Sequence, residues 1–185
     1  DITDFDAVRA FVDESEPYHI LVNSAGTARH SSVGGITETD YQAVMQLNLA
    51  ATIFVSQAVV AKLQATGQGG SIINVSSQMG HVGGPSRAVY AASKHAVEGL
   101  TKAMAIELGA SNIRVNTVCP TFIETELTAK NLSDPDFRSW VLSKIKLGRL
   151  GRVEDIMGPI VFLASEAAGL ITGTALLVDG GWTAE

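Results

Sequence analysis

Tyr90 and Lys94 stand four residues apart in the segment Tyr90-Ala91-Ala92-Ser93-Lys94. On a helix, this spacing places both side chains on one face. An ammonium group beside a phenol favours the phenolate, so we expect Lys94 to lower the pKa of Tyr90 from about 10 toward working pH. A phenol of lowered pKa can give up and take back a proton during a reaction. The pair is therefore a candidate general acid/base.

A serine stands where a third partner is expected. Ser77 lies thirteen residues before Tyr90 and follows the apolar run 71–76, which is predicted as a buried strand. Open α/β sheets carry their chemistry at the ends of strands, so Ser77 is expected near the tyrosine. Ser76 is a rival for the same role. For the Tyr/Lys pair taken alone, helix packing with a solvated lysine is the alternative, because the spacing also occurs by chance.

These side chains need elements that position them, and apolar runs and periodic segments predict strands alternating with helices. The first helix can be capped by Thr3 or Asp4, and the residues Thr37 to Asp40 form a potential capping box for a long second helix. The alternation implies a parallel sheet. Residues 121–150 are predicted as mobile or helical cover. The predicted strands are 19–23, 71–76, 113–118 and 174–178, and the predicted helices are about 4–15, 37–65, 88–110 and 154–165.

Further motifs accompany the Tyr/Lys pair in a fixed order. They are Asn23-Ser24-Ala25-Gly26 after a strand, Asn48 in the long helix, the run Ile113 to Pro120, Ile171-Thr172-Gly173, and Val178-Asp179-Gly180-Gly181. In this order and spacing, the chain resembles the short-chain dehydrogenase/reductase family in its short single-domain form, over nearly all 185 residues. The resemblance implies a doubly wound, Rossmann-like parallel sheet. It also implies that residues 1–185 form one domain, the C-terminal two-thirds or more of a dinucleotide-binding oxidoreductase domain.

The resemblance implies hydride transfer between NAD or NADP and an alcohol or carbonyl carbon. Tyr90 would exchange the proton at the substrate oxygen, and Ser77 would hold that oxygen and stabilise its developing charge. Lys94 would lower the pKa of Tyr90 and hydrogen-bond the nicotinamide ribose. The backbone carbonyl of Asn48 would hold a water that links Lys94 to solvent, with a surface-facing asparagine as the alternative. Ser93 is expected to pack or to hydrogen-bond locally.

A set of cofactor contacts is also implied by the resemblance. Asp1 would meet the adenine amino group, with Ile2 beside the ring. Two positions depart from the family pattern, because Ser24 stands where a second asparagine is usual and Thr121 where glycine is common. Thr121 therefore puts the local loop geometry in question. The other contacts would be Asn23, Ala25 and Gly26 on the adenosine ribose side, and Pro120, Thr121, Ile123 and Thr125 at the nicotinamide amide, together with Tyr90 and Lys94.

The family's glycine-rich turn, Thr-Gly-x-x-x-Gly-x-Gly, does not occur in the sequence. Gly67-Gln68-Gly69-Gly70 precedes a strand and opens no helix, so it is predicted as a loop. By the resemblance, two strand–helix units and a strand, on the order of 60 residues, are missing together with the pyrophosphate site. A truncated, non-catalytic oligomerising or binding module is therefore the alternative function. The choice between NAD and NADP is open, because the discriminating residues lie in that segment.

Composition narrows the possible partners. The net charge is −6 without a Lys/Arg cluster, which argues against nucleic-acid and membrane partners. The single cysteine, Cys119, excludes an internal disulfide, fits a reducing compartment and so a cytoplasmic location, and is expected to be a packed bystander. No signal peptide is expected, and 47–63 is predicted as a buried helix. The four histidines are His19, His30, His81 and His95. No two of them have the spacing of metal ligands, so no metal site is assigned.

Two further questions stay open at this point. The candidate substrates are a sugar or polyol, a 3-oxoacyl thioester, and a small cyclic alcohol. His81 either contacts a polar substrate or is an exposed loop residue. The loops expected to line the substrate pocket carry Gln78, Met79, His81, Glu124 and Trp140.

Small residues recur on one face of the Tyr/Lys helix, at Ala92, Ala96, Gly99 and Ala103. They favour close approach of a second subunit, and so a tetramer or dimer, over packing of this helix on its own sheet.

Overall fold

A four-stranded, all-parallel sheet forms the centre of the structure, a computed structural model that describes residues 1–184 apart from the side chain of Leu127. The strands lie side by side in chain order. Asn23 pairs with Asn74, and Asn74 with Thr117, so the first two strands end within one residue of each other, and the third runs three residues beyond Thr117. The strands are β1 (Ile20–Asn23), β2 (Gly70–Val75), β3 (Ile113–Pro120) and β4 (Ala175–Val178).

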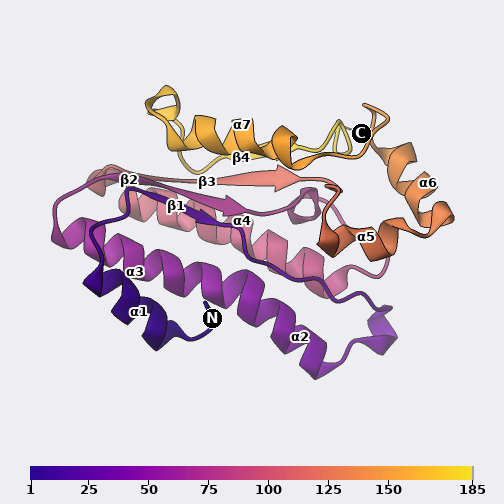
Figure 1. Ribbon diagram of the computed structural model, residues 1–185, viewed down its shortest axis with the longest axis horizontal. Helices are drawn as coiled ribbons and strands as arrows, with labels where there is room; N and C mark the ends of the chain where they lie inside the picture. Colours follow the sequence, from indigo (N-terminus) through magenta and orange to yellow (C-terminus); the bar gives the residue numbers. More distant parts are fainter. Residues whose placement is uncertain (185) are drawn as a thin grey trace.

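Helices cover both faces of this sheet, as expected of a doubly wound, Rossmann-like fold (Figure 1). The helices α1 (Phe5–Glu14), α3 (Ala51–Ala65) and α4 (Ala88–Leu108) lie on one face, and α7 (Val153–Ala164) lies on the other. Because successive strand residues point to opposite faces, Ile72 joins the core beneath α3 and α4. Its neighbour Ile73 joins the core beneath α7.

The long helix before β2 is continuous over Glu38–Ala65 but not uniform. It consists of α2 (Glu38–Met45), a π-helical turn over Gln46–Ala50, and α3. The Thr37 hydroxyl accepts from the Asp40 backbone N–H at 3.1 Å and donates to the Asp40 carboxylate, so it is an N-cap without the reciprocal half of a capping box. By length and mean hydropathy this helix could cross a membrane. It buries the polar side chains of Asn48, Thr52 and Ser56, as a core helix does.

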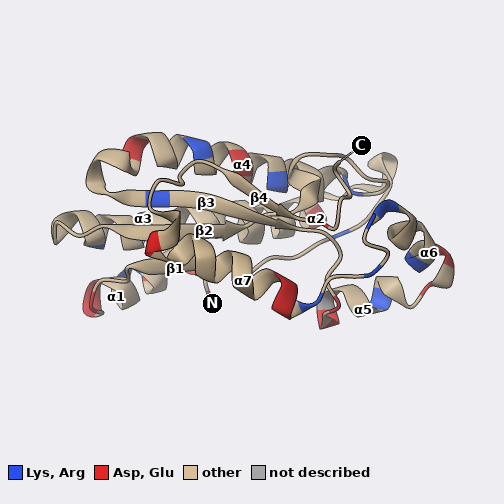
Figure 2. Cartoon of the chain, turned by 90° about the horizontal axis from the view of Figure 1, so that it is seen from above, with Lys and Arg blue, Asp and Glu red and all other residues tan. Residues whose placement is uncertain are grey.

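Two short helices, α5 (Glu126–Leu132) and α6 (Pro135–Lys144), lie beyond the carboxyl end of β3. The segment 121–150, predicted as mobile or helical cover, is therefore helical over much of its length. Phe122, Phe137, Trp140 and Trp182 form a connected set of aromatic contacts with ring centroids 5.5–5.7 Å apart. Basic and acidic residues lie interspersed on the helices and loops (Figure 2).

Candidate active site

The carboxyl ends of β1, β2 and β3 and the first turns of α4 enclose two adjoining cavities. The larger cavity, about 230 Å³, is lined by Gly26, Ser77, Tyr90, Lys94 and Thr121 among others. The smaller cavity, about 90 Å³, shares Ser77, Tyr90 and Thr121 with it. The structure therefore brings the predicted serine, tyrosine and lysine to one place. It is the edge of the sheet where open α/β folds bind ligands.

Lys94 lies on the same face of α4 as Tyr90 but is anchored elsewhere. Its Nζ donates to the backbone oxygen of Val75 at 2.9 Å, and it lies 5.8 Å from the centroid of the Tyr90 ring. Burial lowers the pKa of Lys94 to about 8, while Cys119 and Glu98 act in the opposite direction. The strand end thus fixes the ammonium group within reach of the tyrosine.

The acidity of Tyr90 differs from the expectation. Burial raises the pKa of Tyr90 above its usual value of 10.0, and the nearby Ser77 hydroxyl and Arg87 guanidinium oppose that rise. The expected lowering of this pKa by Lys94 is therefore wrong. The reason is that desolvation of the half-buried side chain outweighs the opposing groups, while the Lys94 ammonium group is bound to the Val75 carbonyl.

Ser77 and Ser76 both lie in the larger cavity but differ in their contacts. The Ser77 hydroxyl donates to Gln78 Oε1 at 2.7 Å and accepts from the Met79 backbone N–H at 3.1 Å. The buried Ser76 hydroxyl has no hydrogen-bond partner within the part of the chain that the structure describes. Ser77 also lines the smaller cavity with Tyr90.

Asn48 lies in the π-helical turn of the long helix and is 1% exposed, so the surface-facing alternative is wrong. Its side-chain amide accepts from the Thr27 N–H at 2.8 Å and donates to the Thr27 carbonyl at 2.9 Å. It also donates to Ser93 Oγ at 3.1 Å, and that hydroxyl donates to the Tyr90 carbonyl. Asn48 therefore joins the loop after β1 to the helix that carries Tyr90. Its backbone oxygen accepts from the Thr52 hydroxyl.

Several predicted cofactor residues line the larger cavity, and their arrangement fits a nicotinamide. A Cβ on Gly26 would come within 3.3 Å of Asn48 Oδ1 and 3.8 Å of Lys94 Nζ, so glycine keeps this wall open. The buried Thr121 hydroxyl has no partner among the described residues and could receive a ligand amide. The backbone φ angle of Thr121 is not positive, so a threonine at the position where glycine is common causes no backbone strain. Pro120, Ile123 and Thr125 also line this cavity.

Other predicted cofactor residues lie outside it. The Asn23 side chain donates to Ser56 and Asn74, each at 2.9 Å, so it is committed to the interior. Ala25 is exposed and lines neither cavity. Asp1 accepts from the backbone N–H and hydroxyl of Thr3, beside a separate hollow that Asp1 and Ile2 line near β1.

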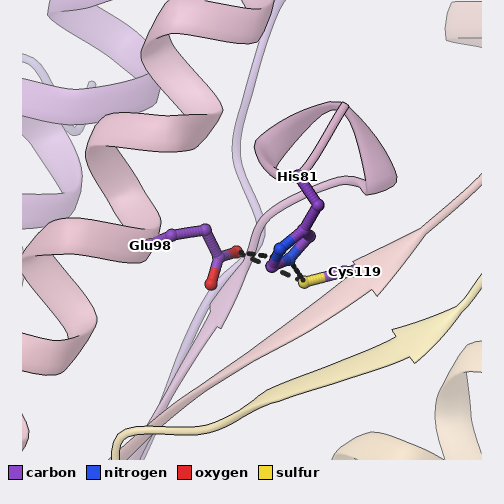
Figure 3. Close-up of side chains that lie close together, drawn as sticks. All are labelled: His81, Glu98 and Cys119. Atoms are coloured by element: carbon purple, nitrogen blue, oxygen red, sulfur yellow. Dashed lines mark hydrogen bonds and ion pairs between the residues drawn. The ribbon is translucent and has the colours of Figure 1, made fainter. Parts of the chain in front are cut away.

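His81 lines neither cavity. Its side chain points toward the buried side chains of Glu98 and Cys119 (Figure 3). Its Nε2 lies 3.4 Å from Cys119 Sγ and 3.7 Å from Glu98 Oε1. Burial raises the pKa of Cys119 to about 12, and the thiol donates to Glu98. Cys119 is therefore a packed, unreactive thiol, as expected. Residue spacing could not show that a histidine, a cysteine and a carboxylate meet here.

A family model described as enoyl-(acyl carrier protein) reductase matches residues 1–183. D-erythrulose reductase from Gallus gallus is 38% identical over 98% of this chain and 74% of the relative. The 3-oxoacyl-[acyl-carrier-protein] reductase FabG from Thermotoga maritima is 40% identical over 97% and 74%. The crystal structure of a gluconate 5-dehydrogenase from Burkholderia cenocepacia in complex with NADP and tartrate superposes with a TM-score of 0.96, at 36% identity, over 100% of this chain and 74% of that one.

The chain belongs to the short-chain dehydrogenase/reductase family. It is an NAD(P)-dependent oxidoreductase that acts on CH–OH groups or the corresponding carbonyls. The non-catalytic module that the missing glycine motif left open is not supported by these relatives. The family resemblance inferred from the order of the motifs is confirmed.

Sequence reasoning missed several residues of this dehydrogenase's smaller cavity, among them His30 and Arg87. Arg87 stands three residues before Tyr90, so helical spacing could have found it. Nothing in the sequence pointed to His30. The predicted pocket residues Gln78 and Met79 line the smaller cavity, whereas His81, Glu124 and Trp140 line neither.

Proposed function

We propose that Tyr90 is the general acid/base of this dehydrogenase, with Lys94 and Ser77 as its partners and Asn48 as a positioning residue. The observation that supports this assignment is the shared cavity wall: Ser77 and Tyr90 face both cavities, and Lys94 faces the larger one. A substrate oxygen placed between Ser77 and Tyr90 would meet a hydrogen-bond donor and a proton-transfer group together.

During oxidation, the substrate hydroxyl gives its proton to the Tyr90 oxygen as the C–H bond breaks. The Ser77 hydroxyl holds the reacting oxygen and stabilises charge that develops on it. The Ser77 hydroxyl and the positive charge of Arg87 favour the phenolate against the burial that raises the pKa of Tyr90. When bound, NAD(P) accepts or delivers the hydride. Reduction runs the same proton transfer in reverse.

For the cofactor, we propose that the larger cavity holds the nicotinamide half. Gly26 and Lys94 would face its ribose, and Pro120, Thr121, Ile123 and Thr125 would face its amide. Asp1 and Ile2 remain candidates for the adenine end, and Asn23 and Ala25 for backbone contacts. NADP is favoured over NAD, because the Burkholderia cenocepacia relative was solved with NADP.

We further propose that residues 1–185 form one domain and that a glycine-rich segment outside them holds the pyrophosphate. This segment would cover the free edge of the sheet. Ile20 of β1 is 52% exposed, and it lines an apolar hollow with Phe11, Tyr18 and Val55. Exposed apolar surface of this kind is typical of a contact site.

The substrate class that fits best is a sugar or polyol. The smaller cavity is short and carries the polar side chains of His30, Gln78 and Arg87 beside Tyr90. A short, polar chamber suits a hydroxylated carbon chain better than a long acyl chain or an apolar ring. Relatives that act on D-erythrulose and gluconate agree with this choice.

A cytoplasmic homo-oligomer, most simply a tetramer, completes the proposal, with no nucleic-acid or membrane partner. The small-residue face of α4 is exposed or half-buried at Ala92, Ala96, Gly99 and Ala103. That exposure supports docking of another subunit over packing on its own sheet. A second apolar face lies on α7, where Met157 is 56% and Val161 64% exposed. Two such faces on opposite sides of the sheet allow a tetramer.

Replacing Tyr90 by Phe tests the assignment. Tyr90→Phe keeps the ring and removes the proton-transfer group, so we expect kcat to fall by about 10²–10⁴-fold. NAD(P)H binding, measured by fluorescence titration, should stay within about twofold. Tyr41→Phe, at a tyrosine that is 51% exposed and outside both cavities, is the matched control. Retained turnover in Tyr90→Phe would remove Tyr90 from the mechanism.

A further inference from the structure

Arg87 is a buried cation without an anion. It is 8% exposed and lines the smaller cavity beside Ser77 and Tyr90. Within residues 1–184, its guanidinium has neither a carboxylate partner within 4.0 Å nor a side-chain hydrogen bond. It lies 6.0 Å from the Phe122 ring centroid and 5.7 Å from that of Phe137. Buried arginines are normally paired, whereas the guanidinium of this one has no acceptor on the described residues and lines the cavity.

The backbone around Arg87 breaks two local rules. Arg87 occupies the N-cap of the 21-residue helix α4 and makes no side-chain cap bond, where Ser, Thr, Asp or Asn is preferred. The preceding Ser86 has a φ of 55°, a left-handed conformation that non-glycine residues rarely adopt. A cation at a helix N-terminus also faces the positive end of the helix dipole. Local costs of this kind persist mainly at functional sites.

The neighbours of Arg87 define what would fit. His30 lines the same cavity although the residue is exposed overall. Partial desolvation together with the Arg87 charge lowers the pKa of His30 to about 4. A neutral imidazole can hydrogen-bond a hydroxyl group without competing for an anion. The cavity volume of about 90 Å³ corresponds to roughly three water molecules. It therefore accepts the end of a short chain.

We infer that Arg87 binds a carboxylate of the substrate, and that the enzyme interconverts a short polyhydroxy acid and its keto acid. This inference rests on the proposed role of the Tyr90 site. The guanidinium can hold a carboxylate through two parallel hydrogen bonds, which fixes the chain end. The reacting carbon then lies farther along the chain, between Ser77 and Tyr90. Oxidation converts its hydroxyl to a ketone, with the proton passing to Tyr90 and the hydride to NAD(P).

A different role for Arg87 predicts different behaviour. Its charge favours the Tyr90 phenolate and opposes the rise in that pKa. If this were its whole function, removing the charge would impair acidic and neutral substrates alike and would move the pH profile of kcat. If Arg87 binds a carboxylate, the loss should fall on acidic substrates and mainly on KM.

The test compares a sugar acid with a neutral sugar in the full-length enzyme. The substrates are 5-dehydro-D-gluconate and L-xylulose, each with NADPH, and the variants are Arg87→Met and Arg87→Lys. We expect Arg87→Met to lower kcat/KM for the acid about 100-fold or more, chiefly through KM, and to lower kcat/KM for L-xylulose by a factor at least about tenfold smaller. Arg87→Lys should retain part of the acid activity. Equal losses on both substrates would overturn the inference.

A binding measurement keeps the test independent of turnover. Tartrate should raise the Tm of the NADP-bound wild type, and neutral erythritol at the same concentration should not. The tartrate shift should vanish in Arg87→Met and persist in part in Arg87→Lys. No tartrate shift in the wild type, or a stronger response to glycerol phosphate than to tartrate, would contradict carboxylate binding. Full turnover in Tyr90→Phe would instead overturn the proposed function and leave these shifts unchanged.

Discussion

Lys94 is an ammonium group buried at the point where β2 ends. It is 5% exposed and donates to the Val75 carbonyl at 2.9 Å, and its burial lowers its pKa to about 8. The unfolded chain keeps the ordinary value of 10.5, so the unfolded state binds more protons between pH 8 and 10.5. The free energy of unfolding therefore rises with pH across that window, and below pH 8 the full cost of burying the charge is present.

Replacing Lys94 by Met should relieve this cost. We expect Lys94→Met to abolish activity yet raise the free energy of unfolding at pH 7 by about 1–3 kcal/mol. This figure is a net value, in which removal of the buried charge outweighs loss of the hydrogen bond to the Val75 carbonyl. At pH 9.5 the gain should shrink, because the wild-type lysine is then mostly neutral when folded. Urea unfolding at both pH values measures the difference, and Lys102→Met, at an exposed position of α4, is the control. If the gain in free energy of unfolding of Lys94→Met over wild type were the same at pH 7 and pH 9.5, burial of the Lys94 charge would not be its cause.

Residue types and spacing were sufficient to predict Ser77, Tyr90 and Lys94, because a strand end and a helical i, i+4 pair define their positions. The state of these groups was not predictable, since burial decides it: the pKa of Tyr90 is raised, against expectation. Helical spacing could have placed Arg87 beside Tyr90, but only the three-dimensional structure shows that its guanidinium has no acceptor on the described residues. Of the two alternatives for His81, the exposed loop residue is confirmed. Its contacts with Glu98 and Cys119 could not be predicted, since those partners come from α4 and β3.

The π-helical turn Gln46–Ala50 is the element that sets the geometry behind these side chains. The periodic pattern predicted one uniform helix over 37–65, and hydrophobic periodicity cannot reveal one extra residue in a turn. Such turns are frequent at functional sites. Here the turn carries Asn48, whose amide bonds both backbone groups of Thr27 as well as Ser93. The strands and long helices were predicted within about two residues, because their apolar runs are buried on known faces.

Asn48→Ala should loosen the loop after β1. The substitution leaves the Thr27 N–H and carbonyl without their present partners, so we expect a loss of about 2–3 kcal/mol in stability. We also expect a fall in kcat that exceeds any rise in KM, together with faster hydrogen exchange at the Thr27 amide. Gln57→Ala, at an exposed position of the same helix, should stay within about 0.5 kcal/mol of wild type. Unchanged exchange at Thr27 in Asn48→Ala would exclude the positioning role.

The apolar surface of the whole molecule is divided between faces that the cores do not use. The outer face of α4 carries small residues and Ile106, which is 84% exposed, and the outer face of α7 carries Met157 and Val161. The free edge of β1 is a third such region. Composition alone indicated an acidic globular chain. The arrangement of the sheet and its helices was needed to show which apolar side chains remain exposed.

Charges placed on the two helix faces should therefore dismantle the assembly in steps. We expect the full-length protein to be a tetramer, and Ala103→Glu on α4 or Met157→Glu on α7 each to yield a dimer, because a carboxylate buried at either contact would lack a partner. The double variant should be a monomer, and Lys102→Glu beside Ala103 is the control for charge alone. Native mass spectrometry measures the assembly, and equal assembly masses for all variants would place the subunit contacts elsewhere. The same experiment gives the mass of the dissociated subunit. A subunit heavier than 19.4 kDa would agree with a further segment on β1, and a subunit of 19.4 kDa would leave the edge of β1 without the proposed segment.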